Sequence, residues 1–155
     1  MINQLKYLLV LLAVAFLGGC QENPDPSSEE IQQIKTQMAS GQWVISKFID
    51  SGKDETSDFA GFVFVFNSSG VLSAKKGSLE YIGTWSITNS SGKNNSQGND
   101  DSQDDLDFNI FFNLTNEFED LNDDWDILTH TSTKIELTDV SGGDGSVDYL
   151  TFIKN

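Results

Sequence analysis

The side chains of this sequence that could do chemistry are mostly carboxylates. They gather in two stretches, and oxygen-rich clusters of this kind suit calcium. Neither stretch has EF-hand spacing with its glycine. Gly142-Gly143-Asp144-Gly145 begins like a calcium-binding β-helix repeat, but Val147 occupies the aspartate position and the motif occurs once. We therefore predict solvated acidic loops and no metal site. The clustered residues are Asp100, Asp101, Asp104 and Asp105, and then Asp123, Asp124 and Asp126.

Other catalytic groups are scarce. The chain has 155 residues with a single His, a single Cys and no Arg. Most hydrolase, phosphoryl-transfer and histidine-metal sites therefore lack their parts. His130 stands between two threonines near a strand end, without a second His or a Cys nucleophile beside it. A carboxylate pair for glycoside hydrolysis has no evident position in a cleft. We predict a protein that is not an enzyme and needs no cofactor.

The charge balance excludes another class of function. Nine Lys+Arg stand against 24 Asp+Glu, which gives a formal net charge of −15. Nucleic-acid binding needs a basic face that displaces counterions from phosphates, so we expect no nucleic-acid partner. The length suits one domain, and one Cys can form neither an internal disulfide nor a cysteine-based zinc site.

The first twenty residues predict an export signal. Lys6 precedes an apolar run from Tyr7 to Leu17, which is the layout of a secretory signal and is shorter than the roughly 20 residues of a membrane-spanning helix. The run ends at Leu17-Gly18-Gly19-Cys20, which resembles the lipobox of bacterial lipoproteins. The resemblance implies that Cys20 carries a diacylglycerol and becomes the new N-terminus. An ordinary cleaved signal with an incidental Cys is the alternative.

The remaining chain divides into a tether and a domain. We predict a signal peptide over 1–19, an acidic, proline-containing tether over 20–28, and a folded domain over 29–155 with a flexible acidic loop at 89–104. Two or more acyl chains hold a protein stably on a bilayer, so the lipid is the expected membrane partner. By resemblance, Gln21 after the cysteine favours an outer-membrane lipoprotein, either periplasmic or surface-exposed.

A helix is expected at the start of the domain. Ser27 and Glu30 have capping-box spacing, and the acidic residues favour a helix N-terminus. One face of about three turns carries the apolar side chains, and Gly41 can end the helix. That apolar stripe, which must dock on another element, consists of Ile31, Ile34 and Met38.

From Gly41 onward the hydrophobic pattern changes to a period of two, which indicates strands. Eight such runs follow in order, separated by turn signals such as Asn67-Ser68-Ser69-Gly70. We predict an all-β, eight-stranded antiparallel up-and-down barrel with a short N-terminal helix, because closure removes exposed edges. A β-sandwich, in which the first and last strands do not pair, is the alternative. The runs lie at 43–49, 62–66, 71–76, 79–88, 106–114, 125–127, 135–137 and 147–154.

The motif order resembles the lipocalin-like domain of small bacterial lipoproteins. A helix leads into Gly41-Gln42-Trp43 on the first strand, as in the lipocalin Gly-x-Trp motif. Gly83-Thr84-Trp85, the segment 120–125 and the closing segment 142–152 add to the likeness. Lipocalins lay an Arg across the first-strand Trp. This chain has no Arg, and Lys154 is the nearest substitute.

The predicted interior is rich in aromatic side chains. An eight-stranded barrel is just wide enough either to pack its own side chains or to hold one small ligand. We therefore expect a non-enzymatic, lipid-anchored and monomeric envelope protein that binds a small apolar ligand. A structural or protein-interaction module with a filled barrel is the alternative, and a small envelope enzyme the third. The candidate pocket residues are Phe64, Tyr81, Trp85, Phe108, Phe112, Trp125 and Tyr149.

Overall fold

The computed structural model describes residues 26–89, 106–140 and 145–155. Cys20, the signal peptide and the acidic cluster at 100–105 lie outside the described residues, as does most of the predicted 89–104 loop. The glycine-rich segment at 142–144 also lies outside them. No helix within the described ranges is long and apolar enough to cross a membrane.

The predicted helix is present and docks as expected. Helix α1 spans Pro26–Ala39. It buries Ile34 and Met38 against the barrel, with Ile31 half-buried beside them. The helix begins at Pro26, within the stretch predicted as tether, so Ser27 lies inside its first turn rather than ahead of it. Proline suits the first helical position because the backbone N–H it lacks would have no partner inside the helix.

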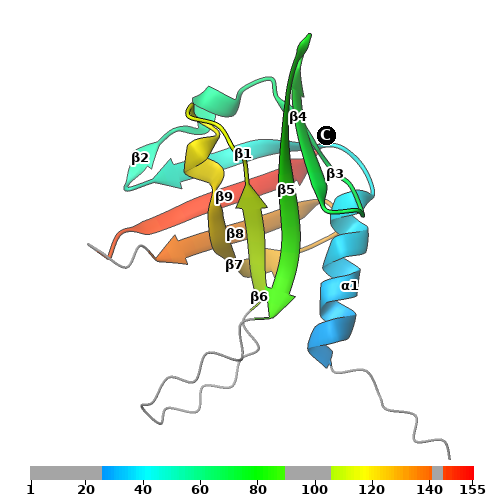
Figure 1. The fold of residues 1–155 in the computed structure, drawn as a ribbon. Coiled ribbons are helices and arrows are strands. Elements are labelled where there is room, and N and C mark those ends of the chain that lie inside the picture. Colours follow the sequence, from blue (N-terminus) through cyan, green and yellow to red (C-terminus); the bar gives the residue numbers. More distant parts are fainter. Residues whose placement is uncertain (1–25, 90–105, 141–144) are drawn as a thin grey trace, which may run out of the picture.

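All eight predicted strands form, and they close into an antiparallel barrel (Figure 1). The short strand β2 pairs only with β1, and from β3 onward each strand pairs with the next in sequence. The barrel is closed by β1, which pairs with β3 on one side and with β9 on the other, the latter over six register positions from Trp43↔Lys154 to Ile49↔Tyr149. This pairing confirms the barrel and excludes the sandwich. The strands are β1 (Trp43–Asp50), β2 (Lys53–Asp54), β3 (Val63–Phe66), β4 (Val71–Lys76), β5 (Leu79–Asn89), β6 (Leu106–Phe111), β7 (Asp123–His130), β8 (Lys134–Val140) and β9 (Val147–Lys154).

One seam of the barrel is narrow. Strands β1 and β3 share a single register pair, Trp43↔Phe64. Beyond it, the 3₁₀ helix η1 (Thr56–Phe59) lies against β1 and supplies the missing hydrogen bonds. The Phe48 N–H donates to Thr56 Oγ1 at 2.8 Å, and the Glu55 N–H donates to the Phe48 carbonyl at 3.0 Å. Neither η1 nor the short strand β2 is predicted by the periodicity, because both are too short to show one.

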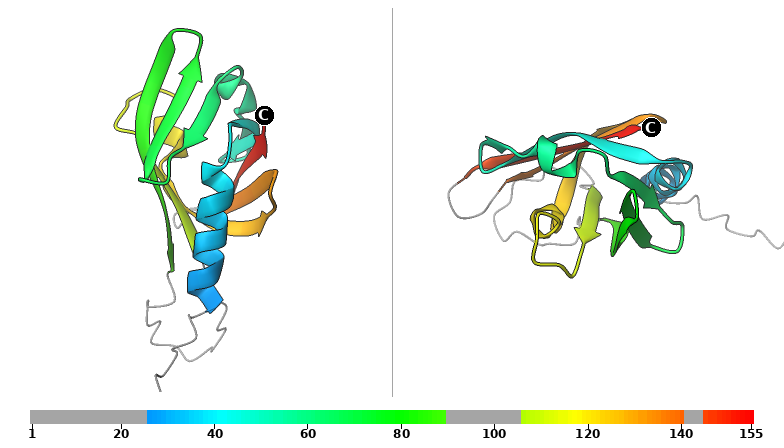
Figure 2. Two further views of the ribbon diagram at one scale, coloured as in Figure 1. Left: turned by 90° about the vertical axis from the view of Figure 1, so that its right-hand side faces the viewer. Right: turned by 90° about the horizontal axis from the view of Figure 1, so that it is seen from above.

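The core lies between two walls of the barrel. Seen from above, β1, β8 and β9 run along one side and β5 and β6 along the other (Figure 2). Side chains alternate between the two faces of each strand, and those of the inner face are buried in one continuous cluster. Gly83 on β5 permits a close approach of β6, since a Cβ there would lie 2.5 Å from the Phe111 carbonyl oxygen. The close packing of β6 on β5 therefore explains the glycine of the motif Gly83-Thr84-Trp85.

Candidate functional site

Most of the predicted pocket residues face the barrel interior. Phe64, Trp85, Phe108, Phe112 and Trp125 are buried, and the most exposed of them retains 5% of its accessible surface. Tyr81 is half-buried and packs against this core. Six of the seven residues predicted from the sequence therefore contribute to the aromatic core of the barrel.

The seventh candidate, Tyr149, was placed wrongly. Its neighbour Leu150 is fully buried, so Tyr149 points to the other side of β9. There the Lys47 ammonium lies 4.2 Å from the centre of its ring, on the outer face of the barrel. Both faces of β9 are apolar in sequence, and only the pairing with β1 and β8 decides which face is inside.

The interior is occupied by the protein's own rings. Phe118, in the connection between β6 and β7, is fully buried and reaches five aromatic neighbours at centroid distances of 4.8–6.1 Å. From there the ring contacts continue without a break through Phe64, Phe152 and Phe66 to Trp85. Phe118 was not among the candidates, because its connection shows no strand period. The five neighbours are Phe59, Phe62, Phe64, Tyr81 and Phe112.

Trp43 lies where helix α1, the start of β1 and the end of β9 meet. Its indole N–H donates to the Met38 carbonyl at 2.9 Å, and the Lys154 ammonium lies 5.7 Å from the centre of its ring. The predicted substitution of Lys154 for an arginine over this ring is confirmed. Gly41 has φ +144°, and a Cβ there would meet the Lys154 side chain, which accounts for the glycine of the Gly-x-Trp motif.

His130 links strand β7 to helix α1. Its Nδ1 lies 3.0 Å from the Gln37 side-chain oxygen, and its Nε2 lies 3.3 Å from a carboxylate oxygen of Glu30. Both partners belong to α1, so the imidazole joins the end of β7 to the helix. These contacts give the single histidine of the chain a role in holding the helix on the barrel.

Four carboxylates on β1, β7, β8 and β9 line part of the barrel end away from α1. We call Asp50, Asp123, Asp139 and Asp148 the acidic rim; each lies two positions from a buried residue of its own strand and so faces the interior. Asp148 is almost fully buried, and its Oδ1 accepts the Ser51 N–H at 2.7 Å. The buried residues are Phe48, Trp125, Leu137 and Leu150, respectively.

Burial and mutual repulsion raise the pKa of two residues of the acidic rim, Asp123 and Asp139. Partial burial raises the pKa of Asp123 to about 6, and the negative charge of Asp139 adds to this effect. Partial burial also raises the pKa of Asp139, with further contributions from Asp148 and Asp124. The acidic stretch 123–126 was predicted to be a solvated loop, and this is wrong: it begins strand β7, with Asp123 facing inward and Asp124 and Asp126 exposed.

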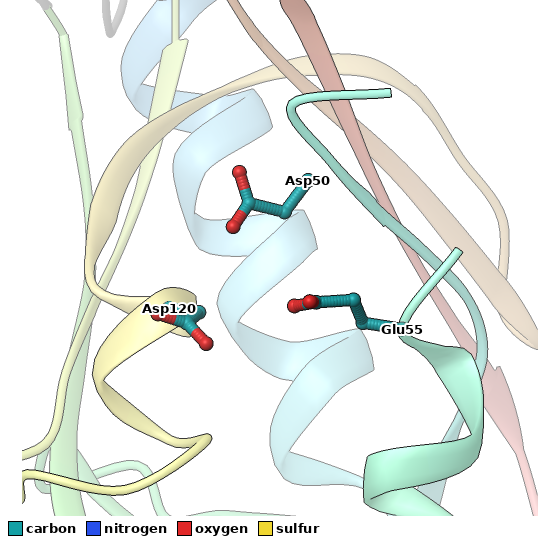
Figure 3. Close-up of side chains that lie close together, drawn as sticks. All are labelled: Asp50, Glu55 and Asp120. Carbon is teal, nitrogen blue, oxygen red and sulfur yellow. The ribbon is translucent and has the colours of Figure 1, made fainter. Parts of the chain in front are cut away.

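Three acidic residues come close enough to share a cation. Oxygens of Asp50, Glu55 and Asp120 lie within 4.8 Å of one another, and Figure 3 shows them converging from β1, from the turn before η1 and from the 3₁₀ helix η2 (Glu119–Leu121). Partial burial, followed by the charges of Glu55 and Asp50, raises the pKa of Asp120. No local spacing in the sequence indicates this group, because Asp120 is distant from Asp50 and Glu55 in the chain.

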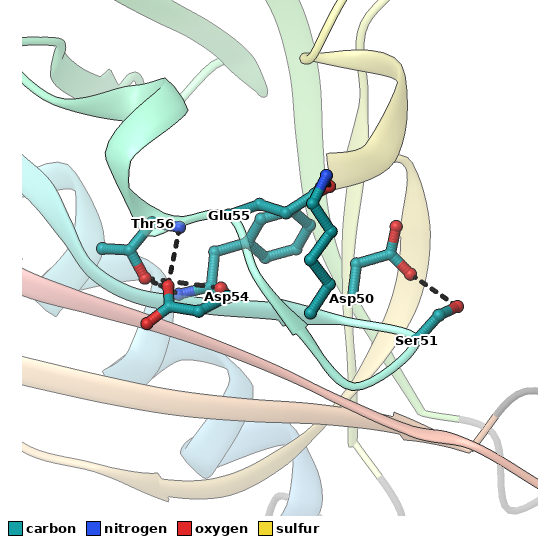
Figure 4. Close-up of polar contacts among 7 residues, drawn as sticks. Asp50, Ser51, Asp54, Glu55 and Thr56 are labelled. Atoms are coloured by element: carbon teal, nitrogen blue, oxygen red, sulfur yellow. Dashed lines mark hydrogen bonds and ion pairs between the residues drawn. The ribbon is translucent and has the colours of Figure 1, made fainter.

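The surroundings of this group already compensate part of its charge. Lys53 forms a 2.5 Å ion pair with Glu55, and Ser51 Oγ donates to Asp50 at 3.0 Å. Asp54 accepts the Thr56 N–H at 3.0 Å, and its hydrogen bonds to Thr56 lower its pKa (Figure 4). With one oxygen from each carboxylate, the group would supply three of the six to eight ligands that calcium takes, and the others would have to come from second carboxylate oxygens, carbonyls or water.

No protein-family model matches the sequence, and no curated protein matches it significantly. Among solved structures, a DUF4847 family protein from Bacteroides vulgatus ATCC 8482 is similar in part. The alignment covers 79% of this chain and 97% of the other, with 17% sequence identity and a TM-score of 0.46.

Proposed function

We propose that this protein is a lipid-anchored, lipocalin-like module of the cell envelope that acts through its outer surface and not as a carrier of an apolar ligand. The observation that carries the proposal is Phe118. This ring sits among five others in the part of the barrel where a carried ligand would have to lie. An eight-stranded barrel has room for its own side chains or for a small ligand, and the ring contacts favour the first.

The anchoring part of the proposal is supported by the sequence of the N-terminus. Leu17-Gly18-Gly19-Cys20 resembles a lipobox and contains the chain's only cysteine. Helix α1 begins six residues after Cys20, so the lipid would hold the barrel close to the membrane surface. On the outer membrane, a barrel filled by its own side chains is suited to hold or contact another envelope component. We propose no enzymatic activity for it.

Native mass spectrometry tests the filled barrel. The full chain is purified gently in a mild non-ionic detergent, and its mass is compared before and after denaturation and refolding. We expect the same mass in both samples. A reproducible non-covalent mass that is lost on denaturation would show a ligand carrier and overturn the proposal.

A separate experiment tests the anchor. Cells are labelled with radioactive palmitate, and the wild type is compared with Cys20→Ala. We expect label on the wild type alone, and accumulation of the variant as an unprocessed precursor. A variant that is still labelled and processed would refute lipidation at Cys20.

A further inference from the structure

A groove crosses the outer face of β5 and is made of two depressions that meet at Ser86. The first, of about 230 Å³, lies over β5 and β6 and is bounded by Thr84, Asn109 and Phe111. The second, of about 200 Å³, lies between β5, Lys35 of α1 and the turn that joins β3 to β4. Trp85 and Ser86 line both depressions, which therefore lie next to each other on β5, and we call the two together the β5 groove.

The strand register creates the first depression. Thr84 pairs with Phe111 and Ser86 pairs with Asn109, and all four side chains point outward. Two small side chains on β5 therefore lie beside two larger ones on β6, which leaves a hollow against the Phe111 ring. This ring is 56% exposed, although it lies beside a buried core. An aromatic ring held in the open next to a hollow is available for stacking.

The second depression is held in shape by backbone hydrogen bonds. The Trp85 N–H donates to the Gly70 carbonyl, and its indole N–H donates to the Asn67 carbonyl, each at 2.9 Å. These bonds fix the turn at 67–70 against β5, which brings the hydroxyls of Ser68 and Ser69 to the groove. The site is thus preformed, and a ligand would not have to order a loop on binding.

The lining has a mixed chemistry that suits one class of ligand. Serine, threonine and asparagine side chains both donate and accept hydrogen bonds, and the Lys35 ammonium donates. Phe111, with Ile82 and Val71 exposed on the neighbouring outer positions, offers apolar contact. A saccharide ring presents hydroxyl groups around its edge and C–H groups on its faces, so it can satisfy both kinds of contact at once.

Other ligand classes fit the lining less well. A purely apolar molecule would cover the hydroxyl groups without replacing their hydrogen bonds to water, which is unfavourable. A polyanion would meet a protein with a net charge of −15, with Asp107 two residues from Asn109 on β6. We propose that the β5 groove binds a short stretch of a neutral polysaccharide chain, with Phe111 stacking on one sugar ring. This deepens the surface function proposed above and rests on it.

Affinity electrophoresis tests this proposal on the full chain in non-ionic detergent. Native gels contain soluble starch, mannan or xylan as neutral probes, and alginate as an anionic probe. The acidic protein migrates in such gels, and we expect at least one neutral polysaccharide to retard it. Absence of retardation by all three neutral probes, or retardation by alginate alone, would overturn the proposal.

Matched variants locate the binding site. Phe111→Ala should weaken the retarding interaction about tenfold, whereas Leu128→Ala, 58% exposed on β7, should leave it unchanged. Ser86→Tyr should fill the junction of the two depressions and abolish retardation, whereas Ser132→Tyr in the turn after β7 should not. Equal effects of the groove and control variants would place binding elsewhere and refute the proposal.

The two proposals fail in different experiments. If the filled-barrel proposal is wrong, native mass spectrometry would show a non-covalent mass. Retardation by a neutral polysaccharide would still be weakened by Phe111→Ala, so the groove proposal would stand. A groove that does not bind saccharides would give unretarded protein, while the mass of the gently purified chain would still be that of the protein alone.

Discussion

Replacing Phe118 by alanine should destabilise the barrel more than a typical core substitution does. The side chain is fully buried and comes from a connection rather than from a strand. No strand pairing would therefore be lost with the ring. The variant isolates what the ring itself contributes to the core.

The expected magnitude follows from the contacts of the ring. Truncation of a buried Phe to Ala costs about 3–5 kcal/mol, and the cost rises with the cavity that remains. Phe118 contacts five other rings, and aromatic pairs contribute beyond their buried area. The surrounding strands are held by barrel closure, so the site can collapse only in part. We therefore expect a loss of about 4 kcal/mol in the free energy of unfolding.

Urea denaturation followed by tryptophan fluorescence measures this loss. With a slope of about 2 kcal/mol per molar urea, the midpoint should fall by about 2 M. Phe111→Ala is the matched control, because the same atoms are removed from an exposed ring, and we expect it to cost less than about 1 kcal/mol. The vacated space is lined by rings, so the Phe118 variant should also gain stability from added benzene.

The result that contradicts this reasoning is simple to recognise. A loss below about 2 kcal/mol for Phe118→Ala, or equal losses for the two phenylalanine variants, would mean that the ring does not fill the interior. The proposal that the barrel works through its surface would then lose its main support.

Three further substitutions test the barrel itself. Thr56→Val should cost about 1–3 kcal/mol in urea denaturation, because the Phe48 N–H loses its acceptor, whereas Thr56→Ser should remain near wild type. Gly83→Ala should cost more than about 2 kcal/mol by the same measurement, because the added Cβ would lie 2.5 Å from the Phe111 carbonyl oxygen. The raised pKa of Asp123 means that the folded protein binds this proton more tightly than the unfolded chain does. The stability that this proton contributes is therefore present below the ordinary aspartate pKa of 3.8 and is lost as the pH rises through about 6. Asp123→Asn should remove roughly 1 kcal/mol of that pH dependence in thermal melts from pH 4 to 7, a value reduced for solvent screening, and an unchanged pH profile would contradict this assignment.

The fold was largely predictable from the sequence because its local signals agree. Most barrel strands carry an alternating pattern of their own, and the turn signals between them leave a meander as the simplest connection. The Gly41-Gln42-Trp43 motif located the start of the first strand, and Lys154 was found over Trp43 as expected. What the patterns could not supply was the boundary at Pro26 and the 3₁₀ helix η1 that seals the narrow seam.

The interior was harder to predict because it depends on contacts between distant segments. Phe118 lies in an irregular connection, where no period indicates burial. Tyr149 was misplaced because both faces of its strand are apolar. The acidic rim did leave a signal: Asp50 lies two residues after Phe48, and Asp148 lies two residues before Leu150. Applied strictly, the alternation that predicts the core also predicts these inward carboxylates.

The two ends of the barrel differ in a way that bears on function. At one end, α1 and Lys154 cover Trp43, and His130 joins the helix to β7. At the other, aromatic packing gives way to inward-facing carboxylates, and partial burial raises the pKa of two of them, Asp123 and Asp139. An apolar ligand entering there would have to pass charged groups and then displace Phe118. Both barriers act against uptake from that end, so the surface of β5, rather than the interior, is where recognition is expected.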